Sequence, residues 1–156
     1  MDEDVTDVLF YQLQARPLEE VLPALLAKTL ERGWRAVVRV GDAMRIPPLS
    51  DAIWSWRDEA FIPHGTERDG HAEHQPIWLS TEAAAVNGAE VLFCVAGAMP
   101  DAEELSGWKR VAVMFAGRDA ARLEQARALW RSLKERDDLA LTYWRQDERG
   151  RWVQQG

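Results

Sequence analysis

The sequence has little cysteine, no long apolar run and a shortage of positive charge. Cys94 is its single cysteine, which excludes an intramolecular disulfide, and its place in an apolar run predicts a small buried side chain in a reducing compartment. The amino-terminal residues 1–4 are acidic where a secretory signal is basic, and no apolar run approaches the ~18 residues of a membrane helix. We therefore expect a cytoplasmic protein without a membrane segment.

The charge balance also limits the classes of partner. Acidic residues outnumber basic ones by 26 to 19, which gives a formal net charge of −7. Because a phosphate backbone attracts clustered lysine and arginine, this charge argues against direct nucleic-acid binding as the first interpretation. A single-strand DNA binder that stacks bases on exposed tryptophans stays open as an alternative. Eight tryptophans are many for 156 residues, and we expect some of them to meet a partner.

Motifs for phosphate binding and for catalysis are missing as well. The first predicted strand-to-helix turn, 14–18, holds no glycine, and neither a P-loop nor a GxGxxG pattern occurs. The five serines lack a nucleophile context, and His71 with His74 would need at least one further ligand to hold zinc. We therefore expect no catalytic residue, no cofactor and no metal. A nucleotide- or S-adenosylmethionine-dependent enzyme that lacks the usual motifs is the enzyme alternative.

Apolar periodicity predicts one domain over residues 1–156, with flexible ends at 1–5 and 154–156. Helices are expected over 18–30, 48–57 and 119–136, with Asp119 as the N-cap of the last and Pro23 as a kink or a late start in the first. Strands are expected at 6–13, 34–40, 77–80, 91–95, 111–115 and 139–145, followed by a tail after 150. This alternation predicts an α/β fold, a Rossmann-like and mostly parallel sheet with helices on both faces.

Two segments indicate binding surfaces, and the first is 52–65. There a helix ends in a loop and carries Trp54, Trp56 and Phe61. Helical spacing puts the two tryptophans about 200° apart, so at least one points away from the face that the other occupies. Large aromatic side chains that stay partly exposed mark a partner site, although burial of all three remains an open alternative.

The second segment is the helix expected over 119–136. Beside its apolar stripe lies a cationic face with Arg127, Arg131 and Lys134, while Trp130 borders both and Arg122 lies one turn earlier, rotated away. Arginine forks onto carboxylates while an aromatic ring supports an apolar side chain. This face therefore suits a short acidic peptide with an apolar end, and a solvated face balanced by neighbouring glutamates is the alternative.

Several segments together resemble the chi subunit of bacterial DNA polymerase III. They follow the order of that family over nearly the whole chain, at 8–13, 30–40, 52–54, 61–64 (Phe-Ile-Pro-His), 111–115, 126–131 and 142–144. The resemblance implies a Rossmann-like, non-catalytic adaptor of the DNA polymerase III holoenzyme in DNA replication. Its implied partners are the psi subunit of the clamp loader and the acidic C-terminal tail of single-stranded-DNA-binding protein, through which it associates with DNA indirectly.

The resemblance also implies roles for particular residues. In the family the aromatic helix and its Phe-x-Pro-His loop contact psi, which implies a psi-facing set of Trp54, Phe61, Pro63 and His64. The family's tail pocket uses basic and aromatic residues of the last long helix, which implies a tail-binding set of Arg127, Trp130 and Arg131, with Arg122 and Lys134 beside them. Two positions depart from well-known members, since Leu123 replaces a lysine and Trp130 stands where tyrosine is more familiar.

Overall fold

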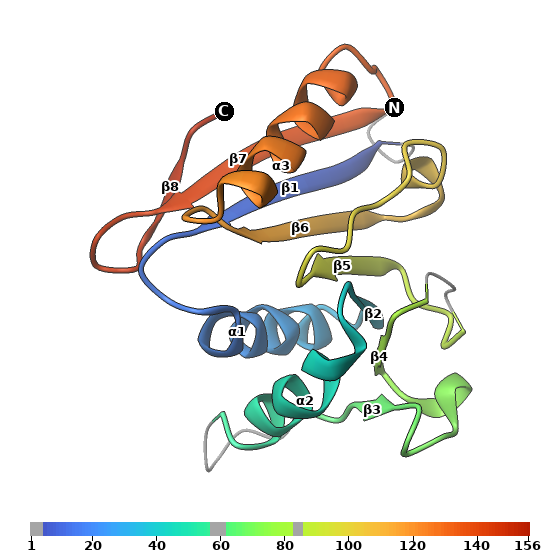
Figure 1. The fold of residues 1–156 in the computed structure, drawn as a ribbon. Coiled ribbons are helices and arrows are strands. Elements are labelled where there is room, and N and C mark those ends of the chain that lie inside the picture. The colour runs from blue at the N-terminus through green and yellow to red at the C-terminus, as the bar shows by residue number, and fades with distance from the viewer. Residues whose placement is uncertain (1–4, 57–61, 83–85) are drawn as a thin grey trace.

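Alternating strands and helices build one eight-stranded sheet in the computed structural model, which describes residues 5–56, 62–82 and 86–156 (Figure 1). The strands are β1 (Thr6–Leu13), β2 (Ala36–Val40), β3 (Gly65–Thr66), β4 (Ile77–Ser80), β5 (Val91–Val95), β6 (Arg110–Ala116), β7 (Leu139–Gln146) and β8 (Trp152–Gln154). The α-helices are α1 (Leu18–Glu31), α2 (Ile46–Trp54) and α3 (Ala120–Leu133), joined by 3₁₀ turns η2 (Ala43–Arg45), η3 (Ala72–His74) and η4 (Leu105–Gly107).

The strand order is β3-β4-β2-β5-β6-β1-β7-β8, and every neighbouring pair is parallel except β7 with β8. All residues of β2 and β5 are buried, and apart from Arg39 in β2 these central strands are apolar throughout. Figure 1 shows α1 and α2 on one face of the sheet and α3 on the other. The predicted α/β class, with a mostly parallel sheet covered on both faces, is confirmed.

The helix boundaries differ from the periodicity in instructive ways. Helix α2 begins at Ile46 rather than at Pro48, and two prolines lie in its first turn. The N–H groups of a first turn have no partner within the helix, so proline, which lacks this group, is tolerated there. Helix α1 begins at Leu18 and continues through Pro23, so the late start is wrong. The carboxylate of Asp119 accepts hydrogen bonds from two N–H groups of α3, which confirms the predicted N-cap, and the helix ends at Leu133.

The segment after residue 150, expected as a tail, returns along β7 as strand β8. Gly150 has φ +81°, a conformation that suits glycine in a tight turn, and the Asp147 carboxylate accepts the N–H groups of Arg149 and Arg151. The last residues, expected as a flexible end, hydrogen bond to Tyr143, whose N–H donates to the Gly156 carbonyl over 3.1 Å. This hairpin brings residues 155–156 beside α3.

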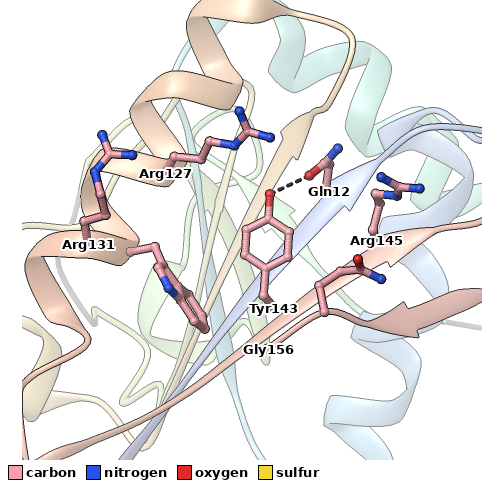
Figure 2. Close-up of a pocket in the computed structure, with 8 residues that line it drawn as sticks. Gln12, Arg127, Arg131, Tyr143, Arg145 and Gly156 are labelled. Atoms are coloured by element: carbon pink, nitrogen blue, oxygen red, sulfur yellow. Dashed lines mark hydrogen bonds between the residues drawn. The ribbon is translucent and has the colours of Figure 1, made fainter.

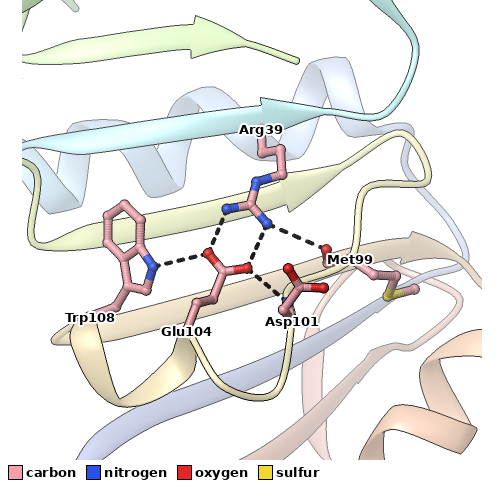
Figure 3. Close-up of polar contacts among 5 residues, drawn as sticks. All are labelled: Arg39, Met99, Asp101, Glu104 and Trp108. Carbon is pink, nitrogen blue, oxygen red and sulfur yellow. Dashed lines mark hydrogen bonds and ion pairs between the residues drawn. The ribbon is translucent and has the colours of Figure 1, made fainter. Parts of the chain in front are cut away.

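A buried polar cluster fixes the loop that precedes β6 (Figure 3). Arg39, on β2, donates from Nη2 to Oε1 of Glu104 over 2.7 Å and from Nη1 to Oε2 over 3.0 Å. The same carboxylate accepts the backbone N–H of Asp101 and the indole N–H of Trp108. Burial raises the pKa of Glu104, but these hydrogen bonds and the charge of Arg39 outweigh it and hold the pKa below its ordinary value.

Candidate functional site

A pocket of about 320 Å³, here called the α3 pocket, opens between α3, the end of β1 and the β7–β8 hairpin. Figure 2 shows Arg127 and Arg131 on the helix side and Arg145 on the side of the sheet. The complete lining is Gln12, Arg127, Trp130, Arg131, Tyr143, Arg145, Gln155 and Gly156. Three guanidinium groups therefore surround one concave surface.

Aromatic rings form the apolar part of the α3 pocket. Trp130 is half-buried and meets Tyr143 edge to face, with 5.6 Å between the ring centroids. Both rings also pack on Phe10 of β1, which is fully buried and holds them against the sheet. The pocket thus combines cations at its rim with a rigid aromatic wall.

The charge state of Tyr143 follows from the same arrangement. Burial raises the pKa of its hydroxyl, and the positive charges of Arg127 and Arg145 oppose that rise only in part. The hydroxyl therefore keeps its proton at neutral pH and donates a hydrogen bond to Oε1 of Gln12 (Figure 2). With tyrosine neutral, the positive charge of the three arginines is not cancelled from within the pocket.

The structure brings together part of the tail-binding set expected from the sequence. Arg127, Trp130 and Arg131 line one pocket. Arg122 instead lines a neighbouring crevice, and Lys134, the C-cap of α3, is exposed and does not line the α3 pocket. Sequence reasoning gave no role to the other side of the pocket, which is formed by Gln12, Tyr143, Arg145, Gln155 and Gly156.

The second expected surface lies at the carboxyl end of α2. A groove of about 500 Å³, here called the α2 surface, runs between α2 and the segment 66–69, and Trp54 lines it. Trp54 is 45 % exposed, and Met44 nearby in sequence is 84 % exposed. Pro63 is half-buried, whereas Phe61 lies outside the described residues. The groove combines apolar side chains such as Trp54 with charged ones such as Asp51 and Arg68. A large aromatic side chain that stays partly exposed in such a groove is typical of a protein contact.

His64 supports the α2 surface from beneath. It is buried, with Nδ1 2.9 Å from the Ile62 carbonyl and Nε2 3.0 Å from the Ser50 hydroxyl. A carbonyl can only accept, so Nδ1 carries the proton and Nε2 accepts from Ser50. Burial lowers the pKa of His64, which keeps the ring neutral, and the ring packs on Trp54 with 4.1 Å between centroids. In this position His64 orients the exposed tryptophan.

Other titratable groups give little sign of chemistry. Burial raises the pKa of the Cys94 thiol to about 12, so the predicted buried cysteine is confirmed and its thiol stays protonated. His71 and His74 lie on an exposed turn, and within the described ranges no group of three or more His, Cys, Asp or Glu side chains is arranged to hold a metal. None of the helices in these ranges is both long and apolar enough to cross a membrane.

Comparison with known proteins identifies the family. Residues 5–140 match the family described as DNA polymerase III chi subunit, HolC. The chain belongs to this family. It is also similar to the "Probable DNA polymerase III subunit chi" of Rickettsia prowazekii (strain Madrid E), with 28 % identity over 71 residues, which is 46 % of this chain and 43 % of that protein.

Family membership confirms the resemblance seen in the sequence. Chi subunits are a non-catalytic component of the DNA polymerase III holoenzyme, and membership implies a replication accessory role. The matched region ends at residue 140 and therefore contains α3 but not the residues from β7 and β8 that complete the α3 pocket. One wall of this pocket thus lies in the family match and the other lies beyond it.

Proposed function

We propose that this chain is a cytoplasmic adaptor of the DNA polymerase III holoenzyme that binds the acidic C-terminal tail of single-stranded-DNA-binding protein in the α3 pocket. The observation that supports this most is the presence of Arg127, Arg131 and Arg145 around the half-buried ring of Trp130. Guanidinium groups bind carboxylates through two parallel hydrogen bonds, and an aromatic wall receives an apolar terminal side chain. The adaptor associates with single-stranded DNA through that tail.

A calorimetric titration with a peptide that copies the tail from the same organism tests this proposal. We expect saturable one-to-one binding that weakens as salt rises, because much of the attraction is between charges. Arg131→Ala should weaken binding by about 1–3 kcal/mol.

Lys134→Ala is the matched control, since it removes the same charge from an exposed position outside the pocket lining. It should change the affinity by less than about 0.5 kcal/mol. Absence of binding at low salt, or equal weakening by both substitutions, would remove the α3 pocket as the tail site.

We propose in addition that the α2 surface binds the psi subunit of the clamp loader. The exposure of Trp54 at the end of α2, with His64 packed beneath it, supports this assignment. Interface tryptophans that fill a partner's pocket are common hot spots. The α2 surface carries charges of both signs beside Trp54, so psi binding should depend on salt less than binding of a uniformly acidic tail does.

Titration with purified psi subunit provides the test. Trp54→Ala should weaken psi binding by about 2–4 kcal/mol and leave tail-peptide binding unchanged. Val153→Ala serves as the control, since it shortens another apolar side chain of similar exposure, 46 %, on β8. If Trp54→Ala binds psi as tightly as the unmodified protein does, psi binds elsewhere.

A further inference from the structure

Two more pockets continue from the α3 pocket along the carboxyl edge of the sheet. The first, of about 460 Å³, shares Arg145 with the α3 pocket and contains Arg118 at its other side. The second, of about 450 Å³, shares Arg118 with the first and extends to Arg16 and Arg122. The three pockets are therefore joined through arginine side chains. We call the group Arg16, Arg118, Arg122 and Arg145 the arginine edge.

Within the part of the chain that the structure describes, no member of the arginine edge forms an ion pair. Arg122 donates to the neutral side chain of Gln125, and its guanidinium lies against Gly97. A Cβ atom on Gly97 would come within 2.7 Å of the Arg122 Cζ, and Gly97 itself has φ +94°. Glycine at this position lets the guanidinium lie flat against the backbone.

Carboxylates are present in the two outer pockets, but most already have partners. Asp119 caps α3, and Glu19 pairs with Arg45 over 2.7 Å. Asp147 accepts the N–H groups of its own turn and the side chain of Arg151. Most of these carboxylates are thus occupied, whereas the arginine edge, among the described residues, forms no ion pair. In a chain of net charge −7, this edge is locally receptive to anions.

We propose that the arginine edge binds the acidic residues that precede the apolar C-terminus of a peptide held in the α3 pocket. This inference rests on the proposed tail-binding function and assigns the direction of the peptide. Its end lies against the wall formed by Trp130 and Tyr143, and its acidic residues run past Arg145 to Arg118 and the second outer pocket. Arg122, expected in the tail site from the sequence, then belongs to the far end of the same site.

Two observations favour an acidic peptide over a nucleic-acid strand. The residues that line the two outer pockets include one aromatic side chain, Phe115, and it is buried. Nucleic-acid bases would therefore find no exposed ring to stack on in these pockets. Glu148 and the capping carboxylates line the same pockets as the arginines, and this mixture of charges suits a uniform phosphate backbone poorly. Continuity with the α3 pocket through Arg145 completes the argument.

Two synthetic ten-residue peptides test the proposal, one with five aspartates ahead of a terminal phenylalanine and one with five asparagines in their place. Arg118→Glu is the informative variant, because Arg118 is exposed, belongs to both outer pockets and does not line the α3 pocket. It should weaken the aspartate peptide at least about tenfold and the asparagine peptide less than about twofold.

Lys28→Glu controls for the general electric field of the protein, because it makes the same charge change at an exposed position. Lys28 lies in the last turn of α1, which covers the face of the sheet opposite α3 (Figure 1). It should leave both affinities within about twofold. Equal weakening by both variants, or loss of both peptides in Arg118→Glu, would overturn the arginine edge while leaving the α3 pocket in place.

Two further outcomes separate the alternatives. If neither peptide binds the unmodified protein, the tail-binding function fails together with the arginine edge. If Arg118→Glu loses binding to an oligothymidine strand but keeps the aspartate peptide, the edge is a nucleic-acid site and the peptide assignment is overturned.

Discussion

Arg39 and Arg131 show two opposite uses of the same side chain. Arg39 is 7 % exposed, and its guanidinium is engaged by both oxygens of Glu104 (Figure 3). Arg131 projects from α3 (Figure 2). Its side chain is 58 % exposed and pairs with Glu124 on the helix surface. One arginine connects β2 to the loop before β6, and the other is presented to the outside.

The difference separates folding from binding. A buried guanidinium must be matched by a carboxylate, because an unpaired buried charge costs several kcal/mol. An exposed guanidinium is hydrated and contributes little to stability. Substitutions around Arg39 should therefore change the free energy of unfolding, and substitutions around the α3 pocket should change affinity for an acidic peptide without unfolding the protein.

The largest effect is expected from Glu104→Ala. It leaves Arg39 buried without its carboxylate and removes the acceptor for Trp108 and for the Asp101 N–H, so the free energy of unfolding should fall by about 3 kcal/mol. Denaturant unfolding measures this. The exposed neighbour Glu103→Ala should change stability by less than about 0.5 kcal/mol. Similar values for the two variants would show that the buried pair does not stabilise the fold.

A pH series sharpens the same contrast. The pKa of Glu104 is lower in the folded protein than in the unfolded chain. Ionised Glu104 therefore contributes its full stabilisation at pH values above the unfolded-state pKa, and this stabilisation is lost as the pH falls through the folded-state pKa. The unfolding free energy of the unmodified protein should therefore drop more steeply than that of Glu104→Gln between about pH 5 and pH 3. Parallel curves would mean that other carboxylates carry the acid sensitivity.

The features that depend on local spacing were predictable from the sequence. Periodicity located the central strands, and Asp119 marked the start of α3. Helical geometry alone placed Arg127, Trp130 and Arg131 together, because residues three and four apart share a face whatever the helix packs against. Helical spacing also predicted that Trp54 or Trp56 would point outward but could not choose between them. The helix expected to reach residue 57 ends at Trp54, and Trp54 is exposed.

The features that depend on neighbours in space were not predictable. Gln12 lies beside Arg145 because β1 pairs with β7 in that register, although more than 130 residues separate them in the chain. The two-residue strand β3 and the strand β8 exist through pairing with β4 and β7 rather than through strong propensity. The sheet-side wall of the α3 pocket, and with it Tyr143, could be found only once the strand order was known.

The smallest effect concerns the ion pair on α3. Glu124 accepts from Arg131 over 3.0 Å, and both side chains are more than half exposed, so the pair contributes at most about 0.5 kcal/mol. A peptide carboxylate that binds Arg131 competes with Glu124 for the guanidinium group. Glu124→Ala should therefore tighten tail-peptide binding about twofold at low salt and leave the unfolding free energy almost unchanged. Glu31→Ala, which removes the same charge from the end of α1, separates this local competition from the general field. Equal tightening by both substitutions would mean that Arg131 is already available, and that only net charge limits the approach of the peptide.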